Sequence, residues 1–361
     1  MLSEERFHGG KWRVRLDFSS NMNPVAPLNL VDNALRRCVE EKAYLRYPDY
    51  TYNGLREALA SFYDIDAHSV IPCNGAAEAL VLALAALKPR RVLLIVPSYG
   101  EWEIRSAAIA LGARVESFMM RKGTVSFGFP LDALVEEDCR GDDVVVICNP
   151  HNPTGAVIGR DRLLNALGGL ECRVIVDEAY AELTPGYPVE MPRDAPGNIV
   201  FIRSMTKWMS IPGLRLGFLY TSDRSVMERI DMLRQPWNVN SLAECLALKL
   251  LVDNKNELME SIEEARSLVA REGPRLARML GEIGLNVYAS STCFLLVEKH
   301  GVDFAVVNEE LVRKHGIAIR PCIGFTGLGK NYARIAVRRR LENQALVNSL
   351  ARVLEENSRV G

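Results

Sequence analysis

Short runs of apolar, mostly β-branched residues alternate with helical patterns through the first two thirds of this chain. The runs occupy residues 92–96, 144–148, 174–176, 199–202 and 216–220. Helical patterns lie between several of them, such as residues 75–87 and 101–111. A strand that is apolar at successive positions is buried on both faces, as in a parallel sheet covered by helices. The alternation therefore predicts an α/β domain around a mostly parallel, doubly covered sheet.

The pattern changes after about residue 240. A long helical stretch is expected over residues 241–280, broken or kinked near Gly273-Pro274 because proline removes a helical hydrogen bond. Short predicted strands (293–297, 318–320, 332–337) and helices (304–314, 342–354) follow. We predict three parts: an N-terminal segment (1–45) packing with the small domain and the active site, a large α/β domain (46–240), and a small α+β domain (241–361).

Charge and composition exclude several kinds of partner. The 361 residues carry a formal net charge of −1, so no general attraction draws the chain to nucleic acid or to an anionic membrane. The N-terminus has no apolar signal core, and no uninterrupted apolar run reaches the about 18 residues of a membrane-spanning helix. A cytoplasmic protein that binds neither nucleic acid nor membrane is expected.

The cysteines and histidines show no metal-binding spacing. None of the eight cysteines forms a C-x-x-C pair, and the five histidines are scattered. We therefore expect no metal site and no disulfide framework, and interpret the cysteines as small apolar core residues.

The segment V-I-V-D-E-A-Y (174–180) is an apolar strand that ends in a carboxylate. Desolvating Asp177 at the edge of a sheet is costly without a cationic partner. The protonated pyridine nitrogen of pyridoxal 5′-phosphate (PLP) would be such a partner. On its own, an aspartate at this position is more often a helix N-cap or a metal ligand.

A lysine follows the next predicted strand, within S-M-T-K (204–207), and Arg215 lies eight residues further on. The hydroxyls and the guanidinium could hold a phosphate dianion. A nearby cation and burial would lower the pKa of Lys207, as an imine-forming amine requires. Taken alone, Lys207 could also be an ordinary surface charge.

Three further segments follow predicted strands or open a predicted helix. The small residues of C-N-G-A-A-E (73–78) leave helix-start N–H groups accessible to an anion. In N-P-H-N-P-T-G (149–155), two Asn-Pro steps and a glycine predict a rigid turn that could present Asn152 to a ring oxygen. In P-S-Y-G-E-W (97–102), Tyr99 offers an aromatic face to a flat ring.

Four of these motifs, in this order and spacing, resemble those of fold-type I PLP enzymes, the class I/II aminotransferase superfamily. They are N-P-H-N-P-T-G, D-E-A-Y (177–180), S-M-T-K and G-L-R-L-G-F (213–218). The resemblance covers most of the chain. It implies PLP as cofactor and a fold-type I α/β architecture: a large domain with a mostly parallel seven-stranded sheet sandwiched by helices, plus a smaller α+β C-terminal domain.

The resemblance also implies residue roles. Lys207 would carry PLP as a Schiff base and shuttle protons, and Asp177 would pair with the ring nitrogen. Asn152 and Tyr180 would contact the ring hydroxyl, and Tyr99 would stack on the ring. The cofactor phosphate would be held by Ala76, Ala77, Ser204, Thr206 and Arg215. Tyr47 would reach the phosphate in a neighbouring subunit, which implies a homodimer with shared active sites, and Arg334 would clamp the substrate carboxylate.

Within the superfamily, two groups compete. The segments around 8–10, 16–24 and 47–49 are similar to those of L-threonine-O-3-phosphate decarboxylases of cobalamin biosynthesis, as are residues 236–243 and 319–322. His8, Asn23 and Arg320 would then lie near the phosphate of a small phosphorylated amino acid. Histidinol-phosphate aminotransferase, or a related aminotransferase, is the alternative. A non-catalytic PLP-sensing regulator would need a DNA-binding domain, for which the sequence has no basic stripe.

Overall fold

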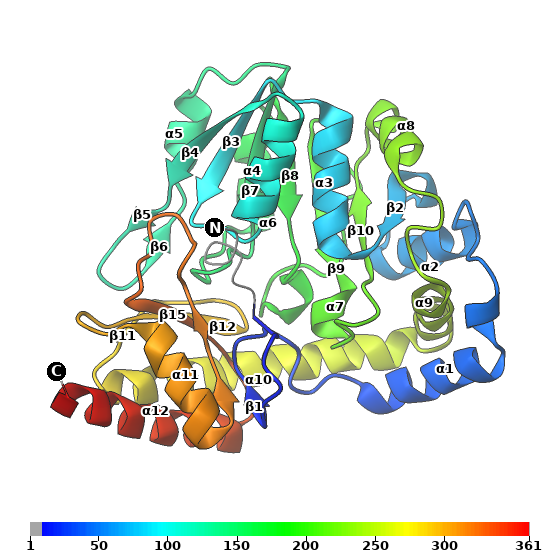
Figure 1. The fold of residues 1–361 in the computed structure, drawn as a ribbon. Helices are drawn as coiled ribbons and strands as arrows, with labels where there is room; N and C mark the ends of the chain where they lie inside the picture. Colours follow the sequence, from blue (N-terminus) through cyan, green and yellow to red (C-terminus); the bar gives the residue numbers. More distant parts are fainter. Residues whose placement is uncertain (1–8, 361) are drawn as a thin grey trace.

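A computed structural model describes residues 9–360, and its largest element is a seven-stranded sheet (Figure 1). The strands follow one another across the sheet in the order β2 Val70–Cys73, β10 Gly217–Tyr220, β9 Ile199–Ser204, β8 Arg173–Asp177, β7 Asp143–Cys148, β3 Arg91–Val96 and β4 Arg114–Met119. Only β10 runs antiparallel to its two neighbours. The five predicted apolar runs form β3, β7, β8, β9 and β10, and the predicted mostly parallel seven-stranded sheet is confirmed.

Twelve α-helices surround the sheets in the described part of the chain. They are α1 Leu28–Glu40, α2 Asn53–Tyr63, α3 Gly75–Leu87, α4 Glu101–Ala110, α5 Leu131–Glu136, α6 Arg160–Leu167, α7 Met205–Trp208, α8 Arg224–Leu233, α9 Ser241–Asp253, α10 Lys255–Glu282, α11 Phe304–His315 and α12 Arg340–Val360. Three short 3-10 helices are η1 Ala43–Leu45, η2 Ala67–Ser69 and η3 Ala181–Leu183. No helix among residues 9–360 combines the length and the apolar character needed to cross a bilayer.

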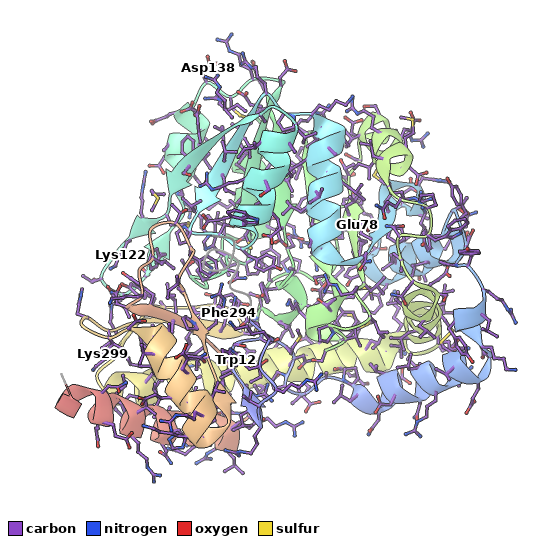
Figure 2. All side chains as sticks on the ribbon, in the orientation of Figure 1. Trp12, Glu78, Lys122, Asp138, Phe294 and Lys299 are labelled. Carbon is purple, nitrogen blue, oxygen red and sulfur yellow. A yellow bond between two sulfur atoms is a disulfide. The ribbon has the colours of Figure 1, made fainter. Side chains whose placement is uncertain are left out.

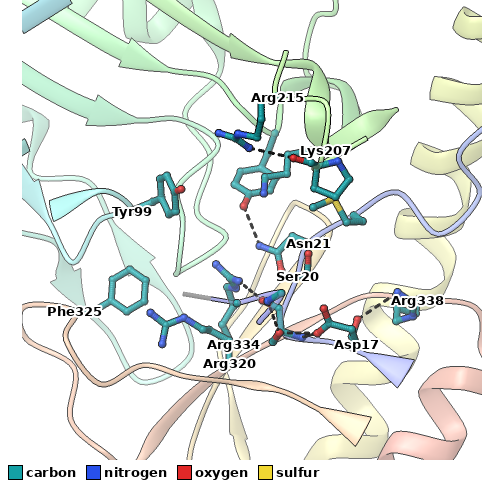
Figure 3. A pocket seen from close by; sticks show the side chains of 16 residues that line it. Asp17, Ser20, Asn21, Tyr99, Lys207, Arg215, Arg320, Phe325, Arg334 and Arg338 are labelled. Carbon is teal, nitrogen blue, oxygen red and sulfur yellow. Dashed lines mark hydrogen bonds between the residues drawn. The ribbon is translucent and has the colours of Figure 1, made fainter. Parts of the chain in front are cut away.

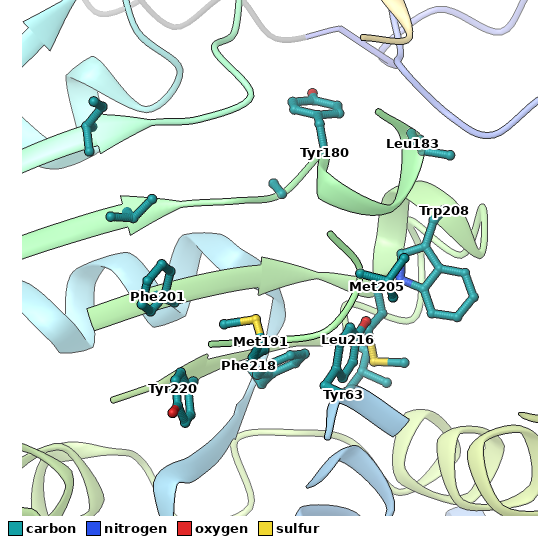
Figure 4. Packing of buried hydrophobic residues seen from close by; sticks show 14 of the residues in the cluster. Tyr63, Tyr180, Leu183, Met191, Phe201, Met205, Trp208, Leu216, Phe218 and Tyr220 are labelled. Carbon is teal, nitrogen blue, oxygen red and sulfur yellow. The ribbon is translucent and has the colours of Figure 1, made fainter. Parts of the chain in front are cut away.

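Alternate residues of the central strands enter two separate cores. Val92 and Leu94 of β3 pack with α3, α4 and α8 on one face of the sheet. Leu93 and Ile95 face the other core, which also takes in α2, α6 and α9. Figure 4 shows part of this second core beside β9 and β10, with Phe201 among its aromatic side chains. Burial on both faces explains why these strands are almost continuously apolar.

The C-terminal third forms a smaller antiparallel sheet. Its strands lie in the order β11 Asn286–Val287, β12 Phe294–Glu298, β15 Tyr332–Ala336 and β14 Arg320–Pro321. Helices α10, α11 and α12 share its core. Two two-stranded sheets complete the fold: β1 Leu16–Asp17 with β13 Ile317–Ala318, and β5 Arg121–Lys122 with β6 Phe127–Gly128. Phe294 of β12 is buried and packs in the same core as residues of the large sheet (Figure 2).

The long predicted helix breaks at a different place from the one expected. Helix α9 ends at Asp253 and α10 begins at Lys255, whereas α10 continues through Pro274. The break predicted at Gly273-Pro274 was therefore wrong. Proline removes one backbone hydrogen bond, but α10 buries Leu268 and Leu276 on either side of it, and this packing keeps the helix continuous.

Two disulfides overturn the expectation that all cysteines are free. Cys38 of α1 is bonded to Cys245 of α9, and Cys139 is bonded to Cys172, the residue before β8. The partners lie 207 and 33 residues apart, so no local spacing signals them. The other four cysteines are free and buried: Cys73, Cys148, Cys293 and Cys322.

Candidate active site

A cavity of about 430 Å³ lies where the carboxyl ends of the central strands meet the smaller sheet (Figure 3). Six residues singled out from the sequence line it: Tyr99, Tyr180, Lys207, Arg215, Arg320 and Arg334. The parallel register aligns Cys148, Asp177 and Ile202 across β7, β8 and β9, which brings their following loops to one edge. Ligands of open α/β sheets bind at this edge.

Lys207 lies in the short helix α7 directly after β9 and lines the cavity. Burial, and next the positive charges of Arg334 and Arg215, lower the pKa of Lys207 to about 8. A substantial fraction of the amine is then neutral near physiological pH. Only a neutral amine attacks a carbonyl, so this environment suits imine formation.

Asp177 ends β8 and is buried. Burial raises the pKa of Asp177 to about 6, although the Ala179 N–H donates to its carboxylate at 3.0 Å and Lys207 favours its charge. A carboxylate desolvated to this extent is stabilised by a cation in the cavity. The protonated ring nitrogen of PLP fits that requirement.

Arg215 packs against the start of α3. Gly75 has a φ of +76°, and a Cβ there would lie 2.6 Å from an Arg215 guanidinium nitrogen, so glycine allows this close approach. Ala76 and Ala77 follow in the first turn of α3. Nearby, the Ser204 and Thr206 hydroxyls are buried and 2.7 Å apart. Helix-start N–H groups, hydroxyls and a guanidinium together fit a phosphate dianion.

The Tyr180 hydroxyl accepts hydrogen bonds from two amides. The Asn21 Nδ2 donates at 3.1 Å and the Asn152 Nδ2 at 3.4 Å. Burial raises the pKa of Tyr180 well above its ordinary value, so the hydroxyl keeps its proton. With its oxygen accepting twice, that proton is available to a ring oxygen in the cavity.

Two arginines lie side by side on neighbouring strands of the smaller sheet. Arg320 of β14 pairs in register with Arg334 of β15, and both line the cavity. Arg334 donates to Asn152 Oδ1 and to the Ser19 carbonyl, each at 2.7 Å. Burial, and next the charge of Arg334, lower the pKa of Arg320 to about 10. Because like charges directly opposite repel, this pair favours an anionic ligand.

Comparison with known proteins identifies the family. The Aminotransferase class I and II description matches residues 14–350. The chain belongs to this family. Its members include PLP-dependent aminotransferases and the PLP-dependent threonine-phosphate decarboxylases, so the chain is a PLP-dependent enzyme, and PLP as cofactor is confirmed.

Proteins with two different activities are similar to this chain over nearly its whole length. A threonine-phosphate decarboxylase of Salmonella typhimurium is 32% identical over 94% of this chain and 91% of its own. Histidinol-phosphate aminotransferase 2 of Archaeoglobus fulgidus is 30% identical, with 94% and 93% covered. The crystal structure of the histidinol-phosphate aminotransferase of Clostridium acetobutylicum superimposes with a TM-score of 0.82 at 26% identity, with 95% and 99% covered.

The other predicted site residues that the structure describes are not among those that line the cavity: Ala76, Ala77, Asn152, Asp177, Ser204 and Thr206, treated above, and Tyr47 and Asn23. Tyr47 is 77% exposed and stacks on Trp237 with ring centroids 4.3 Å apart. Asn23 is buried behind Lys207, where its Nδ2 donates to the Trp208 carbonyl at 2.9 Å and its backbone N–H donates to the Lys207 carbonyl at 3.0 Å. His8 lies outside the described residues. Asn23 thus anchors the N-terminal segment to helix α7, which carries Lys207.

Other cavity residues carried no assigned role in the sequence analysis. They include Asp17, Ser19, Ser20, Asn21, Pro212, Phe325 and Arg338. The polar run from Ser19 to Asn21 was a usable signal, because it interrupts an apolar pattern. Phe325 and Arg338 offered none, since they reach the cavity only through the folding of the smaller sheet.

Proposed function

We propose that this enzyme decarboxylates L-threonine O-3-phosphate to (R)-1-amino-2-propanol O-2-phosphate in cobalamin biosynthesis. The observation that carries the proposal is the Arg320–Arg334 pair in the cavity that Lys207 also lines. L-Threonine phosphate bears a carboxylate and a phosphate on adjacent carbons, and two neighbouring guanidiniums suit two neighbouring anions. The similarity to the Salmonella typhimurium decarboxylase supports the same choice.

The residues of this chain have distinct roles in the proposed reaction. PLP, when bound, supplies a conjugated ring that accepts electrons from a bond at the substrate's α-carbon. Asp177 holds the proton on the ring nitrogen, and Lys207 carries a proton to or from the α-carbon. Arg334 holds the carboxylate and Arg320 the phosphate. Their placement orients the α-carbon and so selects loss of CO2 over loss of a proton.

The proposed enzyme acts as a homodimer. Large apolar side chains are exposed around Tyr47, including Leu45 at 68%, Tyr50 at 56% and Trp237 at 42%. Exposed aromatic clusters of this kind mark protein interfaces. In the dimer, we propose, Tyr47 reaches the cofactor phosphate of the second subunit.

Product analysis tests the activity directly. Purified enzyme with PLP and L-threonine phosphate is expected to release CO2 and form aminopropanol phosphate, while Lys207→Ala forms neither. Glutamate formation from 2-oxoglutarate and histidinol phosphate, without CO2 release from L-threonine phosphate, would contradict the proposal. That outcome would favour the alternative function shared with the Archaeoglobus fulgidus relative.

A further inference from the structure

Glu101 is a buried carboxylate that joins the two parts of the molecule on either side of the cavity. It begins α4 and is only 6% exposed. Its Oε1 accepts the Ser98 N–H at 2.7 Å, on the segment that follows β3. The same oxygen accepts the Thr326 N–H at 3.2 Å, in the loop between β14 and β15. One side chain therefore ties the wall that carries Tyr99 to a loop of the smaller sheet.

The loop that Glu101 holds forms part of the cavity wall. Phe325, the residue before Thr326, lines the cavity, and the Arg320 guanidinium lies 5.3 Å from its ring centroid. Figure 3 shows Tyr99, Phe325 and Arg320 on the same side of the cavity. A cation over an aromatic face is attracted to it, and the ring also limits the rotamers open to Arg320. The position of Arg320 thus depends on where the loop is held.

A local role at the start of α4 explains only half of this arrangement. Ser98 and Glu101 have the S-x-x-E spacing of a capping box, but Gly100 is the N-cap of α4 and Glu101 its first residue, so the bond from the Ser98 N–H fixes the turn before the helix. That local role needs no contact with Thr326, which is 225 residues away in sequence. A buried carboxylate is retained where it satisfies several donors, and here the second donor belongs to the substrate-facing loop.

We propose that Glu101 is a positioning residue for the substrate phosphate, acting through Thr326, Phe325 and Arg320. The inference rests on the proposed function, because Arg320 is assigned to the phosphate only there. Without the carboxylate, the Thr326 N–H loses its acceptor and the loop is free to move away from Tyr99. The phosphate end of a substrate then binds more weakly, while Arg334 keeps its own bonds to Asn152 and Ser19 and still holds the carboxylate end.

Ligand binding without turnover tests the inference. In the PLP-loaded Lys207→Ala background, the dissociation constants of L-threonine phosphate and L-threonine are measured by calorimetry, with and without Glu101→Ala. We expect about tenfold weaker binding of L-threonine phosphate and less than twofold weaker binding of L-threonine. Thr326→Pro removes the loop donor and leaves the Ser98 contact, so it should reproduce the effect, whereas Glu101→Gln, which keeps an acceptor oxygen, should largely restore binding.

A matched control separates positioning from stability. Asp223 caps α8 by accepting from Ser225 N–H and Val226 N–H, and it does not line the cavity. Asp223→Ala should lower the melting temperature and leave both dissociation constants unchanged. Equal weakening of the two ligands by Glu101→Ala, or no weakening, would overturn the inference. If wild-type enzyme binds L-threonine phosphate but releases no CO2 from it, the proposed function fails and the binding comparison still decides the role of Glu101.

Discussion

The Arg334 guanidinium donates to Asn152 Oδ1 at 2.7 Å, which joins the smaller sheet to the turn after β7 across the cavity. Its other terminal nitrogen donates to the Ser19 carbonyl at the same distance. The planar guanidinium of an arginine can donate to both acceptors and still face a carboxylate, whereas the ammonium of a lysine donates from a single nitrogen. Arg334 thus holds three parts of the chain together at the substrate's expected position.

Replacement of Arg334 by lysine is expected to lower kcat/KM by about 100-fold, because charge-assisted hydrogen bonds contribute about 1.5–3 kcal/mol each. The loss should lie mainly in KM for the carboxylate-bearing substrate. Steady-state kinetics measure it, and the amount of PLP bound per chain serves as the control for cofactor loading. An unchanged KM would show that another group binds the carboxylate.

The raised pKa of Asp177 makes the stability of the PLP-free enzyme depend on pH. The pKa of Asp177 rises from 3.8 to about 6 on folding. Between pH 3.8 and about 6, the folded state therefore holds more protons than the unfolded state. Stability conferred by the protonated acid is therefore lost as the pH rises through this window, by about 3 kcal/mol for a shift of this size. Asp177→Asn, which cannot ionise, should lack this loss.

Urea unfolding of the PLP-free enzyme at several pH values between 4 and 6.5 checks the prediction. The wild-type free energy of unfolding should fall relative to that of Asp177→Asn as the pH increases. With PLP bound, the cationic ring nitrogen stabilises the carboxylate, and the difference should shrink or reverse. If the free energies of unfolding of the two PLP-free proteins changed with pH in the same way, this account of Asp177 would be wrong.

The sequence predicted the parts of the fold that obey strong local rules. Strands buried on both faces are apolar at almost every position, which made β3 and β7 recognisable, and the motifs around Asp177 and Lys207 lie at or directly after the ends of such strands. Strand β4 was not predicted. It lies at the sheet edge, where its residues are exposed or half-buried, and its sequence is therefore not a continuous apolar run.

Contacts between distant segments were beyond the reach of sequence reasoning. The bond from Glu101 to Thr326 spans 225 residues, and the Cys38–Cys245 disulfide spans 207. Neither leaves a local pattern, because both arise only when the smaller sheet and α9 pack onto the rest of the chain. The continuity of α10 through Pro274 is likewise a result of tertiary packing outweighing a local preference.

The disulfides should stabilise the folded chain by restricting the unfolded one. The Cys38–Cys245 link closes the longer loop, so the chain-entropy relation predicts about 5 kcal/mol for it and about 4 kcal/mol for Cys139–Cys172. Cys38→Ser should therefore lower the melting temperature more than Cys139→Ser. Thiol counting in denaturant without reductant should find four reactive cysteines, and eight after reduction. Eight without reductant would contradict both links.

The exposed cluster around Tyr47 gives the last prediction. Leu45 is 68% exposed, and a glutamate there would place a charge in the proposed dimer interface, where desolvation is costly. Leu45→Glu should yield a folded monomer by light scattering that has lost most activity. Tyr47→Phe removes only a hydroxyl, so it should remain a dimer and bind PLP more weakly, because the proposed hydrogen bond to the second subunit's cofactor phosphate is lost. Leu111→Glu, at a 40% exposed position after α4, serves as the charge control. A fully active Leu45→Glu monomer would show that each chain completes its own site and that Tyr47 serves no second subunit.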